Sequence, residues 1–543
     1  MQVNAGVARQ RQGLPYKWTV ACVVILGAFM SILDQTVVNI AIPRLQSAFG
    51  ADIHSVQWVA TAYLLTQGAI TPVAPFLANT LGIKRTYIIS LLAFTAGSLL
   101  CGLSWSLPML IFFRVVQGLG GAALLPLSMT LLFREFPPEQ RGVALASLGI
   151  PILIAPALGP IVGGYLVTFA SWQVIFFINI PIGIVAVILA TVFLHEARAE
   201  EAIRFDVVGF ITAAFGLAAV LYAFSESSTS GWGSLNVLGF LVAGSLSLIA
   251  FVFTELRLVR REAKPLLDLR LLANRSFAAG TVALILVTFS LFGLQFLLPI
   301  YLQVLRGLSA FQAGITLLPL ALAAMVSVVI GGRLVDRIGP RIVVIAGLLL
   351  LAIGNWLFAT SLSLNTPYWW FQAGLIVFGL SLGLSGQPLF VAAMAEIRDA
   401  QQIADGTTLI TVVRSVFASL GIAVLATLVQ TQTKVHFTHL AEQVTASSSI
   451  GQLLPRIEGL FLLRGADMHS AASAALQIIA GYVTRQGYLL AMRDAFFLTL
   501  ILTFIAIVAT FFVRGVRRTS QPAQDATAEQ TEQETPAPAL AIG

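Results

Sequence analysis

The segment Trp18 to Ile42, WTVACVVILGAFMSILDQTVVNIAI, decides the fold class of this chain. Asp34 is the only charged residue in this otherwise apolar run. A helix needs about 20 apolar residues to span the hydrocarbon core of a bilayer. The run is too long for the core of a signal peptide, so we interpret it as a retained first membrane span.

The rest of the chain repeats this pattern. Hydrophobic residues make up 58% of the 543 residues and charged residues only 10%, whereas soluble domains carry about 25% charged residues. Lipid offers no hydrogen-bond partners to the backbone, so the apolar runs predict helices. About fourteen runs have the length of a span. They cover residues 18–42, 55–80, 86–104, 108–133, 142–168, 172–194, 207–225, 234–256, 276–303, 311–332, 341–361, 369–395, 406–431 and 493–514.

The charge distribution predicts the orientation of these spans. The net charge is +7, and most of the 31 Lys and Arg residues fall in alternate connecting segments if the N-terminus is cytoplasmic. Cytoplasmic loops of membrane proteins carry such an excess of basic residues. We therefore expect a multi-pass protein of the cell (inner) membrane with both termini in the cytoplasm. The positive charge is explained by these loops, so we do not expect nucleic acid as a partner.

A weak internal repeat predicts the domain organisation. PFLANTLGIKR (Pro75 to Arg85) follows the second span, and GRLVDRIGPR (Gly332 to Arg341) follows the tenth. Two six-helix halves related by a parallel repeat would place these segments in equivalent positions. The predicted parts are a cytoplasmic N-terminus (1–17), an N-terminal half (18–194), two inserted linker helices (207–256), a C-terminal half (276–514) that includes a long outer loop (432–492), and a disordered cytoplasmic tail (515–543).

Charged residues inside spans are costly and therefore point to function. Asp34 is the only carboxylate deep in a span, and it lies on a polar helix stripe with Gln35 and Asn39. It is a candidate proton carrier or a partner of a cationic substrate, and the alternative is a structural hydrogen-bond partner that never titrates. Arg114 in the fourth span keeps its charge and could act on a nearby carboxylate. The alternative for Arg114 is a permanent salt bridge. Arg414 is interpreted as a side chain that reaches the inner surface.

Other residues could line a substrate cavity or shape the helices. Amides among aromatic side chains suit apolar cations or weakly polar drugs, although any one such residue more often serves packing. The candidate cavity residues are Gln35, Asn39, Phe292, Gln295 and Gln387. The fifth span contains a glycine- and proline-rich segment that predicts either tight packing or a bend at a moving interface. Its residues are Gly159, Pro160, Gly163 and Gly164.

The sequence lacks the motifs of a nucleotide-driven pump or an enzyme. It contains no G-x-x-x-x-G-K-[ST] and no H-E-x-x-H segment, and its one G-x-S-x-G match, Gly379 to Gly383, lies inside the apolar run 369–395. We therefore expect no catalytic activity, no cofactor and no metal site, and a proton gradient as the source of energy.

Several of these segments resemble the major facilitator superfamily, and specifically its fourteen-helix drug:proton antiporters of the EmrB/QacA type. LDQTVVNIAIP (Leu33 to Pro43) resembles the first-span signature, whose aspartate maps to Asp34. RVVQGLGGAA (Arg114 to Ala123) resembles the fourth-span motif, whose arginine is linked to proton transfer. APALGPIVGG (Ala155 to Gly164) resembles the fifth-span motif that marks exporters. SWQVIFFINIPIG (Ser171 to Gly183) is also similar to the family, although Gln173 stands where a basic residue is frequent.

The resemblance also extends to the loop motif G-x-L-x-D-R-x-G-R-R, which in the family latches the cytoplasmic side. The second copy matches through Gly332, Leu334, Asp336, Arg337, Gly339 and Arg341. The first copy departs from the pattern at Pro75 and Asn79, which puts an N-terminal latch in doubt. If the source is Gram-negative, the resemblance implies a periplasmic adaptor and an outer-membrane channel as partners.

The expected fold is an all-α integral membrane protein with the major facilitator fold, two six-helix halves and two inserted central helices. The expected function is proton-coupled antiport of amphipathic or cationic drugs by alternating access. The alternative is export of one metabolite, such as an amino acid, a siderophore or an antibiotic. A membrane protein that transports nothing, such as a sensor, is a third hypothesis, and Asp34 and the exporter-like fifth span argue against it.

Overall fold

The computed structural model describes residues 15–71, 73–136, 141–196, 206–261, 268–397, 400–445, 448, 450–464 and 467–513. The predicted tail (515–543) and nearly all of the predicted N-terminus (1–17) lie outside these ranges. Every regular element within them is helical, which confirms the all-α fold class. The first helices are α1 (Tyr16–Phe49), α2 (Ile53–Val56), α3 (Trp58–Ile70), α4 (Val73–Leu81), α5 (Ile83–Gly102), α6 (Leu107–Glu135), α7 (Arg141–Phe169), α8 (Val174–Phe177) and α9 (Asn179–Phe193).

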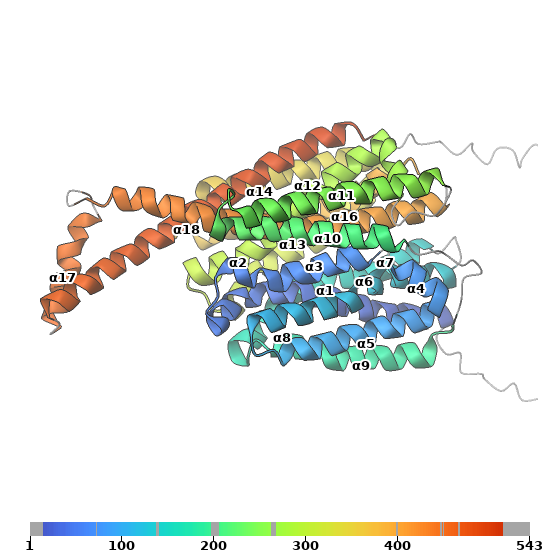
Figure 1. The fold of residues 1–543 in the computed structure, drawn as a ribbon, viewed down its shortest axis with the longest axis horizontal. Coiled ribbons are helices and arrows are strands. Elements are labelled where there is room, and N and C mark those ends of the chain that lie inside the picture. Colours follow the sequence, from blue (N-terminus) through green and yellow to red (C-terminus); the bar gives the residue numbers. More distant parts are fainter. Residues whose placement is uncertain are drawn as a thin grey trace, which may run out of the picture.

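The second part of the chain continues in the same way. Its helices are α10 (Val207–Ser230), α11 (Leu235–Arg260), η2 (Leu269–Ala273), α12 (Arg275–Ile300), η3 (Tyr301–Leu305), α13 (Ala310–Ile338), α14 (Pro340–Ser361), α15 (Tyr368–Met394), α16 (Ala400–Glu442), η4 (Gly451–Leu453), α17 (Leu454–Leu463) and α18 (Met468–Phe511). The long helices run side by side along the longest axis of the molecule (Figure 1).

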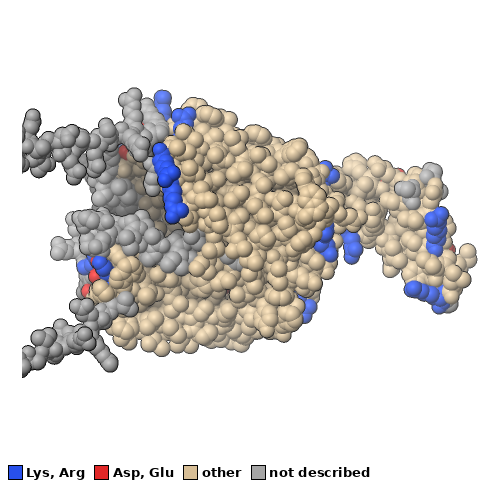
Figure 2. Space-filling model, turned by 180° about the vertical axis from the view of Figure 1, so that it is seen from behind, with Lys and Arg blue, Asp and Glu red and all other residues tan. Residues whose placement is uncertain are grey.

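Among the described residues, 12 helices are long and apolar enough to cross a membrane. Two predicted spans are not among them. Residues 55–80 fall on α3 and α4, which have 13 and 9 residues and are each too short to span a bilayer. Residues 142–168 fall on α7, in which the apolar segment from Ile154 to Phe169 is shorter than a full span. The total of fourteen therefore stays a prediction. The charged side chains lie mostly at the two ends of the bundle, with an uncharged band between them (Figure 2).

The helices form two groups that follow the order of the chain. In Figure 1 the blue to cyan helices α1 to α9 gather on one side of the bundle, and the green to red helices on the other. The groups meet where α7 packs along α13 and α3 packs along α16. The helices α10 and α11 pack on each other, and α10 also contacts α16 and α3. The domain boundaries proposed from the sequence stay a prediction.

Residues 432–492, for which the sequence predicts a long outer loop, are mostly helical. The helices α16 and α18 have 43 and 44 residues, which exceeds the roughly 20 residues that cross a bilayer. Their ends leave the bundle and, with α17, form a projecting hairpin (Figure 1). Within this segment the sequence predicts a helix from Ala471 to Arg493 that leads into the last span, and α18 contains this helix. At its start Asp467 accepts a hydrogen bond from the backbone N–H of Ser470, which caps the helix.

The two copies of the loop motif share one backbone feature. Gly82 lies between α4 and α5 with φ 97°, and Gly339 lies between α13 and α14 with φ 86°. Both values fall in a region that residues with a Cβ rarely adopt, so glycine is required at each turn. The alignment of Gly82 with Gly339 in the sequence therefore reflects the same helix–turn–helix corner in both groups of helices.

Candidate functional site

The Asp34 carboxylate lies in the middle of α1 and is almost completely buried, with 1% of the residue exposed. Its Oδ2 accepts a hydrogen bond from Nη1 of Arg114 at 2.5 Å, and the two side chains form an ion pair. Its Oδ1 accepts hydrogen bonds from Nε2 of Gln117 and Nδ2 of Asn179, both at 2.9 Å. The structure therefore brings the two predicted coupling residues into direct contact.

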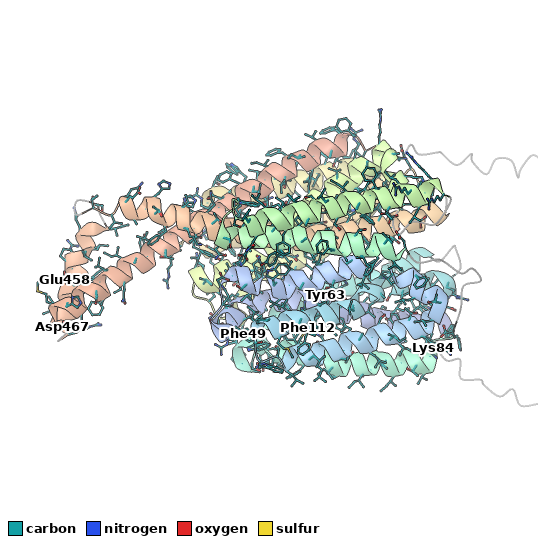
Figure 3. The ribbon with its side chains drawn as sticks, in the orientation of Figure 1. Phe49, Tyr63, Lys84, Phe112, Glu458 and Asp467 are labelled. Atoms are coloured by element: carbon teal, nitrogen blue, oxygen red, sulfur yellow. The ribbon has the colours of Figure 1, made fainter. Side chains whose placement is uncertain are left out.

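Arg114 on α6 is held by more than the carboxylate. Its Nε donates to the backbone oxygen of Val59 at 2.9 Å, and its Nη1 also donates to Oε1 of Gln117 at 2.7 Å. The guanidinium lies over the ring of Tyr63, 4.2 Å from its centroid, which adds a cation–π contact. Tyr63, labelled in Figure 3 among the N-terminal helices, forms a hydrogen bond of 3.1 Å with Ser31 through its hydroxyl.

Ser98 on α5 completes the network. Its Oγ accepts hydrogen bonds from Gln117 Nε2 at 3.1 Å and Asn179 Nδ2 at 2.9 Å, and it donates to the backbone oxygen of Phe176 at 2.9 Å. Each member of this polar network is buried in the N-terminal group of helices. We call this cluster the buried polar network, formed by Ser31, Asp34, Tyr63, Ser98, Arg114, Gln117 and Asn179.

Gln117, Asn179 and Ser98 are not among the site residues that the sequence predicts. Gln117 had a detectable signal, because it follows Arg114 by one helical turn and shares its face. Asn179 lies 145 residues from Asp34, and Ser98 is a small polar residue of a kind that is frequent in packed membrane helices. Only the packing of α5 and α9 against α1 and α6 identifies these two.

The geometry limits what the carboxylate can do in this conformation. Three N–H donors engage its two oxygens, and the residue is closed off from solvent. A proton that reaches Asp34 would replace the ion pair with Arg114, because a neutral carboxyl group accepts fewer charge-assisted hydrogen bonds. The carboxylate is therefore closed off from proton exchange with solvent in this conformation.

The predicted cavity residues lie on three helices. On α1, Gln35 is half-buried, and Asn39 is buried with an Oδ1 that has no hydrogen-bond partner. On α12, Phe292 and Gln295 are half-buried. Gln387 on α15 is exposed. Within the described residues no hydrogen bond connects these five side chains, and their role in substrate binding stays a prediction.

The glycines of α7 occupy close helix contacts. A Cβ at Gly159 would meet Thr36 of α1, one at Gly163 would meet Ile40, and one at Gly164 would meet the backbone of Ala310 on α13. The carbonyl of Pro160 in turn lies where a Cβ on Gly314 of α13 would be. These residues thus allow α7 to lie close to both α1 and α13. A bend of α7 during transport stays a prediction.

The two groups of helices also contact each other at the end of the bundle from which the hairpin projects. Gln303 donates to the backbone oxygen of Ile40 at 2.9 Å, and the N–H of Phe311 donates to Oγ1 of Thr168 at 3.0 Å. In Figure 3 Phe49 lies at this end and Lys84 at the opposite end. The halves are therefore joined at the end that the charge pattern assigns to the outer side.

The loop motifs lie at the opposite end. In the first copy, the N–H of Lys84 donates to Oε1 of Glu196 at 3.2 Å, and Nε of Arg85 lies 3.7 Å from Oε2 of the same carboxylate. In the second copy, the guanidinium of Arg341 lies 5.5 Å from the centroid of the Phe511 ring on α18. Arg337 is exposed, and the side chain of Asp336 lies outside the described part of the structure. The latch function of these residues stays a prediction.

Comparison with known families agrees with this architecture. A model of the Major Facilitator Superfamily matches residues 24–422. The chain belongs to the major facilitator superfamily. This family membership and the apolar helices identify a multi-pass membrane transport protein.

Individual relatives of this major facilitator chain cover most of its length. It is 36% identical over 414 residues to the Multidrug resistance protein B homolog of Mycobacterium tuberculosis, which is 76% of each chain. It is 34% identical over 340 residues to the Tetracenomycin C resistance and export protein of Streptomyces glaucescens, 62% of each. The crystal structure of a bacterial homolog of the human lysosomal transporter Spinster shares the fold, with a TM-score of 0.60 and 15% identity over 92% of this chain and 97% of that one.

Proposed function

We propose that this major facilitator protein exports amphipathic drug-like molecules across the cytoplasmic membrane in exchange for protons. The observation that carries the proposal is the ion pair between Asp34 and Arg114, buried within the apolar bundle. Taking two charges out of water is expensive, so a pair at this depth favours a functional role. The relatives named for multidrug resistance and for tetracenomycin C export support the direction of transport and the class of substrate.

The proposed mechanism is alternating access driven by the proton gradient, without a cofactor. In the described conformation the ion pair is intact and the two halves meet at the predicted outer end. Protonation of Asp34 from the outer side frees Arg114 and loosens α1 from α6. A ligand or a proton shifts the equilibrium between the inward-facing and outward-facing states only if it binds one of these states more tightly than the other. Drug release outward and proton release inward would then alternate through the same network.

The projecting hairpin is the part that we assign to partner proteins. If the cell has an outer membrane, we propose that a periplasmic adaptor docks here and leads to an outer-membrane channel. The hairpin exposes several large apolar side chains, which favour protein contacts. They include Leu460, Leu463, Met468 and Leu476.

Export of a single metabolite is the second candidate function. The similarity to the Tetracenomycin C resistance and export protein, whose name specifies one antibiotic, favours it. The two candidates predict the same coupling residues and differ in the number of substrates.

The test is dye transport in inverted membrane vesicles for wild type, Asp34→Asn and the matched control Asp467→Asn, which removes a carboxylate outside the network. A lipophilic cation and a carboxylated dye are both used, with and without a proton gradient. Gradient-driven uptake of either dye by wild type and Asp467→Asn, lost in Asp34→Asn, is the expected result. Equal transport in all three proteins would contradict coupling through Asp34.

A further inference from the structure

Arg414 is a second charged residue in the middle of the bundle, outside the buried polar network. It lies roughly 21 Å along α16 from Ala400, at about 1.5 Å per residue. Its side chain is exposed to solvent, although the neighbouring residues Ser415 and Val416 pack against Gly68 of α3. Within the described residues it has neither a hydrogen bond nor an ion pair. Its charge is therefore not neutralised by any carboxylate in the part of the chain that the structure describes.

The contacts of neighbouring residues show which way Arg414 faces. A Cβ at Gly421, two turns further along α16, would meet the backbone of Phe289 on α12. Ser415, the next residue after Arg414, lies 3.0 Å from a Cβ placed on Gly68 of α3. With about 100° between successive helical residues, Arg414 falls between the α12 side and the α3 side of α16. It therefore faces the meeting of the two halves, whereas the sequence suggested a side chain that reaches the inner surface.

The face of α16 that carries Arg414 is polar toward one end of the helix and apolar toward the other. Toward Ala400 it carries half-buried Thr407 and Thr411 beside Arg414. Toward the hairpin it carries Ala418, Ile422 and Leu425, all of them buried. The strip is thus polar and accessible on the predicted inner side of the contact and closed by apolar packing on the outer side.

The helices that Arg414 faces supply no carboxylate. Neither α3 nor α12 contains Asp or Glu in its sequence, and the Asp34 carboxylate is already bound by Arg114. An arginine cannot be neutralised by losing its proton. A charge inside a membrane protein that has no partner among the described residues is unfavourable, and a bound anion would supply its counter-charge.

We propose that Arg414 binds an anionic group of the transported molecule, so that the preferred substrates are amphipathic compounds with a carboxylate or a comparable anion. This inference rests on the proposed export function. Within that function it favours amphipathic anions over simple cations as substrates. A guanidinium forms bidentate, charge-assisted hydrogen bonds with a carboxylate. Half-buried Phe292 and Gln295 on neighbouring α12 would suit the apolar part of such a molecule.

The experiment is equilibrium binding of one dye in two forms, a carboxylated xanthene dye and its methyl ester, to purified protein in detergent. Wild type should bind the carboxylate at least about tenfold more tightly than the ester, given the strength of hydrogen bonds to charged groups. Arg414→Gln should abolish the preference by weakening only carboxylate binding, and Arg414→Lys should retain part of it. Arg456→Gln on α17 is the matched control and should behave as wild type.

The outcomes separate this inference from the proposed function. Unchanged ester binding shows that Arg414→Gln is folded, and Arg414→Lys provides a second variant if it is not. Equal affinity of wild type for both dye forms, or a preference that survives in Arg414→Gln, would overturn the inference even if proton-driven transport is observed. A preference that depends on Arg414 in a protein without proton-driven transport would support anion binding and reject the export mechanism. If chloride binds at Arg414 and the carboxylated dye does not displace it, Arg414 holds only a simple counter-ion. This outcome would also overturn the inference.

Discussion

At the scale of single residues, the buried polar network explains how two opposite charges are tolerated deep in an apolar bundle. Asp34 receives three hydrogen bonds, and Arg114 also donates to a backbone carbonyl. Removing one partner of a buried pair is more costly than removing both, because it leaves an unpaired charge. Loss of either Asp34 or Arg114 would therefore leave the other side chain as an unpaired buried charge.

The pairing of these two buried charges predicts the effect of Arg114→Met on stability. The variant leaves the Asp34 carboxylate without its cation and should lower stability by about 3–5 kcal/mol. The double variant Asp34→Asn with Arg114→Met should recover much of this loss, since no charge remains. Thermal unfolding of the purified proteins in detergent measures both effects. Additive losses in the double variant would show that the two residues do not stabilise each other.

Loss of Gln117 or Asn179 should lower the stability less than loss of Arg114 does. Replacing Asn179 with Leu removes one of the two donors to Oδ1 and should cost about 1–3 kcal/mol, the usual penalty for an unsatisfied buried group. Transport should fall while dye binding persists, because the network holds α1 rather than the substrate. Measurement of binding and transport on the same preparation tests this. Loss of binding with intact transport would contradict it.

At the scale of elements, α7 is the helix that connects the two halves. Its glycines let it lie against α1 and α13 at once, and the aromatic rings of Tyr165, Phe169 and Phe311 pack around the same corner. Phe169 and Phe311 lie 5.6 Å apart, centroid to centroid. Closure of this end therefore depends on how closely α7 approaches α13.

Enlarging Gly164 should open this end. In Gly164→Val the added atoms would collide with the backbone of Ala310, which cannot turn aside as a side chain can. Overpacking of this kind typically costs about 1–3 kcal/mol. Distances between spin labels on the ends of α7 and α13 should increase in the variant. Gly239→Val on α11, where a Cβ meets nothing within 4 Å, is the control and should leave the distances unchanged.

At the scale of the whole molecule, contacts between distant segments hold the halves together at the hairpin end. Asp52 caps α2 by accepting from the N–H of Ser55 at 2.8 Å, and it also accepts from Nε2 of Gln430 on α16 at 3.1 Å. Burial alone would raise the pKa of Asp52, but the hydrogen bonds from Ser55 and Gln430 outweigh it and hold the pKa below the ordinary 3.8. The ionised carboxylate therefore stabilises this connection.

The lowered pKa of Asp52 predicts a pH dependence. Its contribution is fully present above the unfolded pKa and is lost as the pH falls through the lower folded pKa. Asp52→Ala should cost about 1 kcal/mol at neutral pH, as for other helix caps, and the difference from wild type should shrink below pH 3.8. Unfolding of both proteins across the acidic range measures this. A difference that stays constant down to the lowest pH would exclude the ionised cap as its cause.

The sequence by itself determined most of the long apolar helices and singled out the two charged residues that form the buried ion pair. Long apolar runs with few charges can only form membrane helices, and Asp34 and Arg114 stand out because charge is rare there. The paired glycines Gly82 and Gly339 were likewise visible as a repeat. These features are local, so the order of residues along one segment is enough to reveal them.

Only the tertiary structure decided which residues share a site. Ser98 and Asn179 are 81 residues apart and meet at one hydrogen bond, and no pattern within either helix records that contact. The direction of Arg414 also depended on packing. A helix can turn any face toward its neighbours at little intrinsic cost, and in lipid the hydrophobic effect does not select that face. Close contacts between small residues and buried polar groups select it, and these exist only once the helices are assembled.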